Sequence, residues 1–118
     1  MFRAHIETTF ESAHANGPEG HKCHVMHGHS WVAEIEWEYG PDQQDAYGWG
    51  PDFGAAKGII RNLDHQNLNE VFEFAPSAEN IAKWMYEEFE RMFGFFPDFV
   101  RLHEGRGNTM TYSDPAND

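Results

Sequence analysis

The sequence predicts an α+β fold in which helices pack against an antiparallel sheet. Two segments near the start of the chain alternate polar and apolar residues, which is the pattern of half-buried strands. Two later segments repeat apolar residues at helical spacing, and two more strand-like segments follow them. Strands separated by a run of helices favour an antiparallel layer over a doubly wound parallel sheet. The 118 residues suit a single domain with one core.

The first two strands are predicted over residues 2–14 and 29–39. In the first strand the even positions form the face toward the core, and this face ends at His14. Glutamates line one face of the second strand, and its core face is formed by Trp31, Ala33, Ile35, Trp37 and Tyr39. The glycine-containing segment from His14 to Gly28 joins the two strands as a loop.

Two helices are predicted from their caps and apolar stripes. Asp52 is the N-cap of the first helix, whose apolar residues are Phe53, Ala56, Ile60 and Leu63. Ser77 is the N-cap of the second helix and Gly94 ends it. The apolar stripe of this helix consists of Ile81, Trp84, Met85, Phe89 and Met92. Strands over residues 98–104 and 108–113, joined by a glycine-rich turn, complete the sheet.

The composition argues against several classes of function. The chain has 20 acidic and 8 basic side chains, giving a net charge of −12, and phosphate binding to nucleic acid needs a basic surface. No apolar run approaches the roughly 20 residues that span a membrane, and the first residues do not resemble a signal peptide. The single cysteine, Cys23, cannot form an internal disulfide. We therefore expect a cytoplasmic protein without nucleic-acid or membrane partners.

Three histidines are predicted to converge at one end of the first two strands. The core face of the first strand ends at His14, and that of the second, extended backward in phase, passes through His29 and His27. In a hairpin these three imidazoles share one face. Three nitrogen ligands with an open fourth position are typical of a catalytic zinc site, whereas structural zinc sites have four protein ligands. His21 and His24 in the loop are alternative ligands, although no strand directs them.

Cys23 precedes His27 by four residues, which predicts that the thiol lies within reach of the metal. A thiol near a divalent cation is more readily deprotonated and can act as a base or a nucleophile. Cys23 could instead bind zinc as a fourth ligand, which would make the site structural. The remaining interpretation is a small buried apolar residue.

Asp64 and His65 follow the first predicted helix as a possible acid–base pair. An aspartate can orient an imidazole and stabilise its protonated form. Adjacent side chains point in different directions, so this pair requires irregular backbone, which Asn67 and Asn69 favour. Alternatively, Asp64 caps a turn.

Glu104 shares the apolar face of the third predicted strand with Val100 and Leu102. A carboxylate on such a face requires a partner. The partner could be a basic residue in a salt bridge, or a guanidine-like ligand edge bound through two hydrogen bonds.

The ordered set of these residues resembles the 6-pyruvoyl-tetrahydropterin synthase family, and within it the bacterial 6-carboxy-tetrahydropterin synthases. The His-Gly-His motif alone would be weak evidence, but the similarity runs along nearly the whole chain. The matching segments are Phe10–His14, Glu19–Cys23, His27–Ser30, Asp52-Phe53 with Lys57, Leu63–His65, Leu68-Asn69, Pro76–Asn80, and Glu104 with Tyr112.

The resemblance implies the tunnelling fold, which is a four-stranded antiparallel sheet with two helices on one face. Members of the family assemble such sheets into barrels, as trimers or hexamers, with active sites at subunit interfaces. Pairing between copies is physically sensible because the edges of an open sheet are exposed. We therefore expect a homo-oligomer.

The resemblance also implies a role for each candidate residue. His14, His27 and His29 match the ligands of a catalytic Zn²⁺ ion. Cys23 matches the catalytic thiol, and Asp64 with His65 matches the proton-transfer pair. Glu104 matches the residue that binds the amino-pyrimidine edge of the pterin. Three basic residues, Lys22, Lys57 and Arg106, are candidates for binding a triphosphate.

The implied reaction converts 7,8-dihydroneopterin triphosphate to 6-carboxy-5,6,7,8-tetrahydropterin, acetaldehyde and triphosphate, a step towards 7-deazaguanine bases such as queuosine. The three residues between Cys23 and His27 are similar to the carboxy branch of the family. A 6-pyruvoyl-tetrahydropterin synthase, which eliminates triphosphate, would share every core residue. A non-catalytic zinc-binding barrel protein is the third possibility. The chain departs from the family at Ser77, where threonine is frequent, and at His24, where relatives often have a smaller residue.

Overall fold

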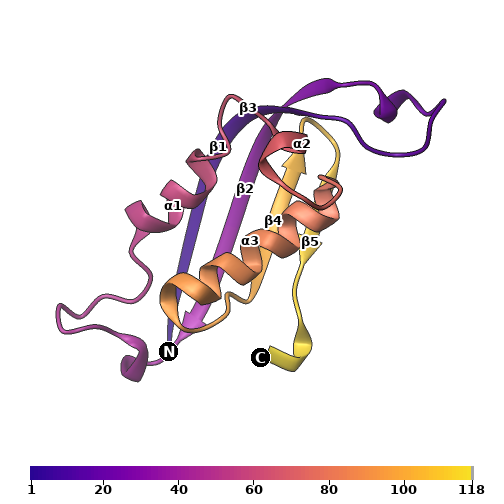
Figure 1. Cartoon of the computed structure of the whole chain (residues 1–118). Coiled ribbons are helices and arrows are strands. Elements are labelled where there is room, and N and C mark those ends of the chain that lie inside the picture. The colour runs from indigo at the N-terminus through magenta and orange to yellow at the C-terminus, as the bar shows by residue number, and fades with distance from the viewer. Residues whose placement is uncertain (118) are drawn as a thin grey trace.

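The computed structural model describes residues 1–117, and Asp118, the last residue of the predicted domain, lies outside the described residues. A sheet with the strand order β3-β1-β2-β4-β5 forms its centre (Figure 1). Its four main strands are β1 (Phe2–His14), β2 (His27–Tyr39), β4 (Phe99–Glu104) and β5 (Thr109–Tyr112). They pair antiparallel in the order β1-β2-β4-β5, which confirms the predicted fold class. β2 begins two residues earlier than predicted, so His27 belongs to the strand.

The sheet departs from the prediction at one edge, where a fifth strand is present. β3 (Gln66–Asn67) pairs in parallel with Ser12 and Ala13, so the sheet is mixed and not wholly antiparallel. The single-turn helix α2 (Leu68–Val71) follows it and was not predicted either. Elements of two and four residues are too short to leave a periodic pattern in a sequence.

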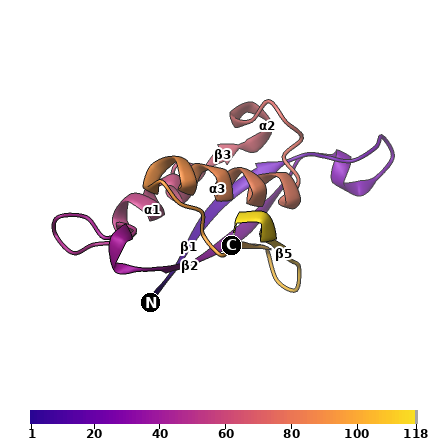
Figure 2. The same cartoon turned by 90° about the horizontal axis from the view of Figure 1, so that it is seen from below.

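Two helices, α1 (Phe53–Arg61) and α3 (Ala78–Phe93), cover one face of the sheet (Figures 1 and 2). The side chain of Asp52 accepts a hydrogen bond from Ala55 N, and that of Ser77 accepts one from Asn80 N, as the predicted N-caps require. Gly94 ends α3 with a φ of 84°, in the left-handed region that favours glycine. The opposite face of the sheet is polar, and no helix covers it within the described chain.

The core lies between the sheet and these two helices. Trp31, Trp37 and Phe89 are fully buried there. Leu63 is also buried, although it lies beyond the last residue of α1. Met92, predicted to belong to the apolar stripe of α3, is 44% exposed. At this end of α3 it is Phe93 that packs against Trp37, with 5.8 Å between the ring centroids.

The molecule is elongated, with principal extents of 52 × 28 × 27 Å. Part of this length comes from the loop between β1 and β2, which extends past the end of the sheet (Figure 1). The loop contains a short 3₁₀ helix, η1 (Lys22–His24). Within residues 1–117, none of the helices combines the length and apolar character that crossing a membrane requires.

Candidate metal centre and active site

The pairing of β1 with β2 brings the three predicted metal ligands together. His14 lies directly opposite His27, and His29 lies two residues further along β2 on the same face. The ring centroids of His14 and His27 are 4.6 Å apart, and those of His27 and His29 are 4.8 Å apart. One ligand nitrogen from each ring lies within 4.8 Å of the other two. The structure thus forms a group of three imidazoles that one metal ion can join.

Backbone carbonyl groups orient two of the three imidazole rings. His14 Nδ1 donates a hydrogen bond to Pro76 O at 2.6 Å, and His27 Nδ1 donates one to Val25 O at 2.7 Å. Because a carbonyl oxygen can only accept, each ring carries a proton on Nδ1, which leaves Nε2 as the nitrogen available to a metal ion. Histidine ligands of metal ions characteristically donate their other N–H in this way.

The chemistry of the donors fits a metal ion. The Nε2 atoms of His14 and His29 are buried without a hydrogen-bond partner in the described residues. A buried polar atom in this state destabilises the fold unless something satisfies it, and a bound ion would do so. Burial is the main cause that lowers the pKa of His29, and the charges of His14 and His27 add to it, whereas Glu104 opposes it. His29 is therefore neutral at neutral pH, which is the form that binds metal.

Glu104 faces the metal-binding nitrogens. Its Oε1 lies 3.3 Å from His29 Nε2, and its Oε2 lies 3.8 Å from His14 Nε2. In the described chain these two histidines are its ion-pair partners, and no lysine or arginine is paired with it. Beside it lies a pocket of about 200 Å³, lined by Ala78, Glu79, Leu102, Asn108, Thr109 and Met110. Glu104 thus connects the metal-binding group with a space that could hold part of a small molecule.

Trp31 separates the histidines from the core, a role that the sequence analysis missed. The indole is fully buried, and its centroid lies 5.0 Å from that of His14 and 5.3 Å from that of His29. Its Nε1 donates a hydrogen bond to Ser12 O at 3.1 Å. Trp31 thus forms an apolar wall on the core side of His14 and His29, and Glu104 faces their Nε2 atoms.

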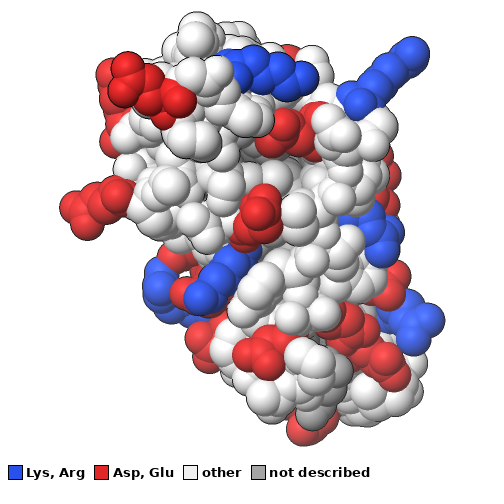
Figure 3. Space-filling model, turned by 90° about the vertical axis from the view of Figure 1, so that its right-hand side faces the viewer, with Lys and Arg blue, Asp and Glu red and all other residues white. Residues whose placement is uncertain are grey.

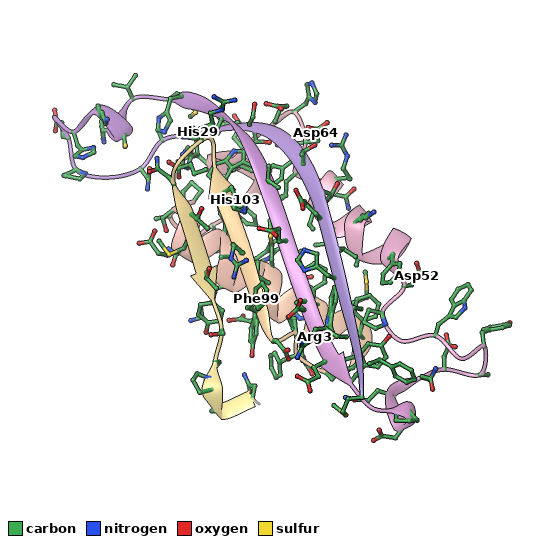
Figure 4. The ribbon with its side chains drawn as sticks, turned by 180° about the vertical axis from the view of Figure 1, so that it is seen from behind. Arg3, His29, Asp52, Asp64, Phe99 and His103 are labelled. Atoms are coloured by element: carbon green, nitrogen blue, oxygen red, sulfur yellow. The ribbon has the colours of Figure 1, made fainter. Side chains whose placement is uncertain are left out.

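Asp64 and His65 form the hydrogen-bonded pair that the sequence suggests. His65 Nδ1 donates to Asp64 Oδ2 at 2.8 Å. The irregular backbone expected there is present, because His65 has a φ of 56°, unusual for a residue other than glycine. The pKa of Asp64 is lowered, chiefly by the hydrogen bond from Glu11 N and then by that from His65. Asp64 and His29 lie at the same end of the sheet (Figure 4).

A shallow pocket of about 460 Å³ lies beside His65 and reaches one of the three metal-binding histidines. Its lining includes both His65 and His29. The side chain of His65 is 81% exposed and is therefore free to meet a ligand in this pocket.

Cys23 lies apart from the histidine group. It is half-buried on η1, in the loop that extends beyond the sheet (Figure 1), and it does not belong to the described residues whose ligand atoms converge. The alternative ligands have other contacts, since His21 Nδ1 accepts from Cys23 N at 3.0 Å and His24 Nδ1 donates to Gly17 O at 3.1 Å. The four-residue spacing to His27 thus does not bring the thiol to the metal-binding group within one chain, because the loop turns away from the end of β2.

Comparisons with known proteins place the chain among pterin enzymes. Residues 3–115 match the family described as 6-pyruvoyl tetrahydropterin synthase. A protein of Archaeoglobus fulgidus named "Putative 6-carboxy-5,6,7,8-tetrahydropterin synthase" is 34% identical over 87 residues, covering 70% of this chain and 71% of that protein.

Solved structures of this family have the same fold. The 6-pyruvoyl tetrahydropterin synthase of Caenorhabditis elegans is similar with a TM-score of 0.75 at 22% identity, covering 96% of this chain and 95% of that one. The corresponding Plasmodium vivax enzyme is similar with a TM-score of 0.58 at 13% identity, covering 97% and 99%. At these identities the likeness shows the fold, which is the tunnelling fold. Together with the match along the sequence, it shows that the chain belongs to the 6-pyruvoyl tetrahydropterin synthase family, whose members are metal-using tetrahydropterin synthases of the lyase class.

Proposed function

We propose that the chain is a zinc-dependent 6-carboxy-5,6,7,8-tetrahydropterin synthase in the biosynthesis of 7-deazaguanine bases such as queuosine. It would convert 7,8-dihydroneopterin triphosphate to 6-carboxy-tetrahydropterin, acetaldehyde and triphosphate. The observation that carries the proposal is the group formed by His14, His27 and His29, in which two buried Nε2 atoms have no hydrogen-bond partner in the described chain. Three imidazoles with an open side fit a catalytic zinc ion.

Each residue of the site has a distinct task in this proposal. Bound zinc would polarise the side-chain oxygens of the substrate and acidify the neighbouring C–H and O–H bonds. The Glu104 carboxylate accepts two hydrogen bonds from the amino-pyrimidine edge and so orients the pterin. His65 accepts and returns a proton through Nε2, because its Nδ1–H is held by Asp64. Trp31 keeps the core side of the site dry.

We also propose that copies of the chain complete one another's active sites. Cys23 projects on a loop beyond the sheet, away from the histidines of its own chain (Figure 1). β5 forms one edge of the sheet, and β3 covers only Ser12 and Ala13 of β1 at the other. These open edges could pair between copies in a trimer or hexamer, which would bring the loop of one copy to the histidines of another.

The thiol's role is tested by Cys23→Ala. Because Cys23 lies outside the ligand group, we expect the variant to keep its zinc and its thermal stability. Turnover should fall by about 10²-fold or more, as for the loss of a proton-transfer group. Full turnover by Cys23→Ala would exclude a catalytic thiol, and loss of zinc would make the thiol a metal ligand.

The decisive test measures zinc per chain by elemental analysis and identifies products by mass spectrometry after incubation with 7,8-dihydroneopterin triphosphate. We expect about one zinc per chain, with 6-carboxy-tetrahydropterin and acetaldehyde as products. His29→Ala should lose both the zinc and the products. His103→Ala is the matched control, because His103 lies on the polar face of the sheet and belongs to neither group of described residues that could hold a metal ion, the second being His5, Glu7 and Glu34.

The alternative function is that of a 6-pyruvoyl-tetrahydropterin synthase, favoured by the similarity to the Caenorhabditis elegans enzyme of that name. The Archaeoglobus fulgidus relative and the short Cys23–His27 spacing favour the carboxy branch. Pyruvoyl-tetrahydropterin as the only product would decide for the alternative. Zinc without any turnover would indicate a non-catalytic metal-binding protein.

A further inference from the structure

We propose that Arg61 is a positioning residue, which fixes the carboxylate of Asp64 and through it both the orientation and the protonation of His65. This inference rests on the proposed function for the importance of the Asp64–His65 pair. The sequence pattern gave no reason to single out Arg61, because a basic residue in the last turn of a helix is common and stabilises the helix end by itself.

The contacts of Arg61 engage the pair directly. Arg61 is the last residue of α1, and one guanidinium nitrogen donates to Asp64 Oδ2 at 3.1 Å. The other terminal nitrogen donates to Thr9 O on β1 at 2.5 Å. Asp64 Oδ1 accepts from Glu11 N at 2.7 Å. Both carboxylate oxygens therefore have partners, and Oδ2 is shared between Arg61 and His65.

This arrangement determines how the His65 ring is held. The ring is 81% exposed, so packing does not fix it, and in the described chain its side-chain hydrogen bond is to Asp64. The backbone of His65 is anchored separately, by donation from His65 N to Glu11 O at 2.6 Å. The backbone thus stays in place without Arg61. The carboxylate then keeps one fixed donor, Glu11 N, and its bond from the exposed His65 ring, so carboxylate and ring can turn together about the Glu11 contact. Arg61 accordingly controls the orientation of the His65 imidazole and not the course of the backbone at His65.

The charge of Arg61 also acts on the proton of His65. A guanidinium beside Asp64 Oδ2 repels a second positive charge on the neighbouring imidazole. The same charge helps to lower the pKa of Asp64, after the hydrogen bonds from Glu11 N and His65. The charge of Arg61 therefore disfavours the protonated form of His65. A proton that His65 takes up during turnover is then released more easily. Removing the charge should strengthen the pair formed by protonated His65 and Asp64.

The test compares Arg61→Met and Arg61→Lys with the wild type as zinc-loaded protein. Arg61→Met should lower kcat on the order of tenfold, a part of the 10²–10⁴ that a positioned acid–base group contributes. KM and zinc content should stay unchanged, and the limb of the pH profile that reports on His65 should move to higher pH. Arg61→Lys keeps the charge but not the planar fork, so it should restore the position of that limb but only part of kcat. Arg101→Met, on the polar face of the sheet, is the matched control.

A second measurement separates this inference from the proposed function, because it needs no substrate. The titration of the His65 ring can be followed by NMR, with the signal assigned by its loss in His65→Asn. A midpoint displaced to higher pH in Arg61→Met but not in Arg101→Met supports the inference, even if the protein turns over no pterin. An unmoved midpoint in a folded Arg61→Met protein overturns the inference, even if the wild type is an active synthase.

Discussion

Among residues 1–117, the buried residues with polar side chains are Ser12 and His14, which lie at one end of β1. Ser12 Oγ donates to Leu63 O and accepts a hydrogen bond from Gln66 N at 3.3 Å. It therefore attaches β1 to the segment that carries Asp64 and His65. His14 is 1% exposed and presents Nε2 to the candidate metal centre. Both of these buried polar side chains thus help to assemble the site.

Removal of the metal should destabilise the protein. A ligand present at 100 times its dissociation constant stabilises the folded state by about 2.7 kcal/mol, and zinc would act in this way here. We expect a chelator to lower the melting temperature of the wild type but not that of His29→Ala, which has lost a ligand. Thermal unfolding followed by circular dichroism checks this. Equal melting temperatures with and without chelator, in protein loaded with zinc beforehand, would contradict it.

Glu34 on the polar face of the sheet should make stability depend on pH. His103 Nε2 lies 2.5 Å from its carboxylate, and His5 Nε2 lies 3.4 Å from it. The hydrogen bond to His103 is the main cause that lowers the pKa of Glu34 from its ordinary 4.5, whereas burial opposes the shift. A lowered pKa in the folded state means that the stabilisation is complete above about 4.5 and is lost as pH falls through the folded value.

Glu34→Gln should therefore lower the free energy of unfolding at neutral pH by about 1–2 kcal/mol, the range for a hydrogen bond to a charged group. The difference from wild type should shrink as the solution becomes more acidic than pH 4.5. Urea unfolding over a pH series measures both. A difference that stays constant from neutral to acidic solution would show that the charge of Glu34 is not responsible.

At the scale of elements, the sequence predicts whatever depends on a repeating pattern or a local cap. The alternation in β1 and β2, the caps at Asp52 and Ser77, and the glycine that ends α3 are all local signals, and the structure contains each of them. The alternation also predicts that the three histidines converge, since it places them on one face near the end of a hairpin.

Features that depend on register or on non-periodic backbone could not be predicted. The alternation of residues in β4 predicts that Glu104 lies on the face toward the core. Only the register that pairs Glu104 with Trp31 brings it to the histidines. The course of the loop that carries Cys23 follows from contacts such as that of Asn16 N with Cys23 O, which no spacing reveals. The two-residue β3 and the contact of Arg61 with Asp64 depend on how α1 docks against β1.

The short helix α2 has a consequence for the loop that follows His14. Asn69 on α2 accepts a hydrogen bond from Ala15 N and donates one to Ala15 O, both at 2.8 Å. Its amide therefore fixes the chain at the point where the Cys23 loop begins. Asn69→Ala should cost about 1–2 kcal/mol, because it removes two hydrogen bonds. Urea unfolding measures this cost, and Asn62→Ala, at an exposed position outside α2, is the matched control.

The same substitution should lower turnover more than zinc content, since His14 keeps its bond to Pro76 O while the loop loses its anchor. Metal analysis beside the product assay tests this. An Asn69→Ala protein with less zinc but normal turnover per bound zinc would place the effect on the metal centre and not on the loop.

At the scale of the whole molecule, the net charge of −12 opposes association of identical chains. Acidic side chains are distributed over the face drawn in Figure 3, with basic ones among them and not in one patch. The repulsion between copies is screened beyond about 10 Å at 0.1 M salt. We therefore expect the proposed oligomer to strengthen as ionic strength rises, until screening is complete.

Sedimentation velocity over a salt series would show this as a shift toward larger species at constant protein concentration. The wild type at low salt is the control. Dissociation with added salt would mean that attractive ion pairs between copies outweigh the repulsion of their net charge.

The position of Trp31 gives the metal centre an optical reporter. Its indole touches the rings of both His14 and His29 and is fully buried, whereas Trp49 is 58% exposed. An ion that binds these two imidazoles changes the electric field at Trp31 and leaves the exposed indole in water. An aqueous quencher removes the emission of Trp49, and the equally buried Trp37 packs against Phe89 and Phe93 instead of the histidines. The part of the remaining emission that changes when metal is added or removed would therefore report on Trp31.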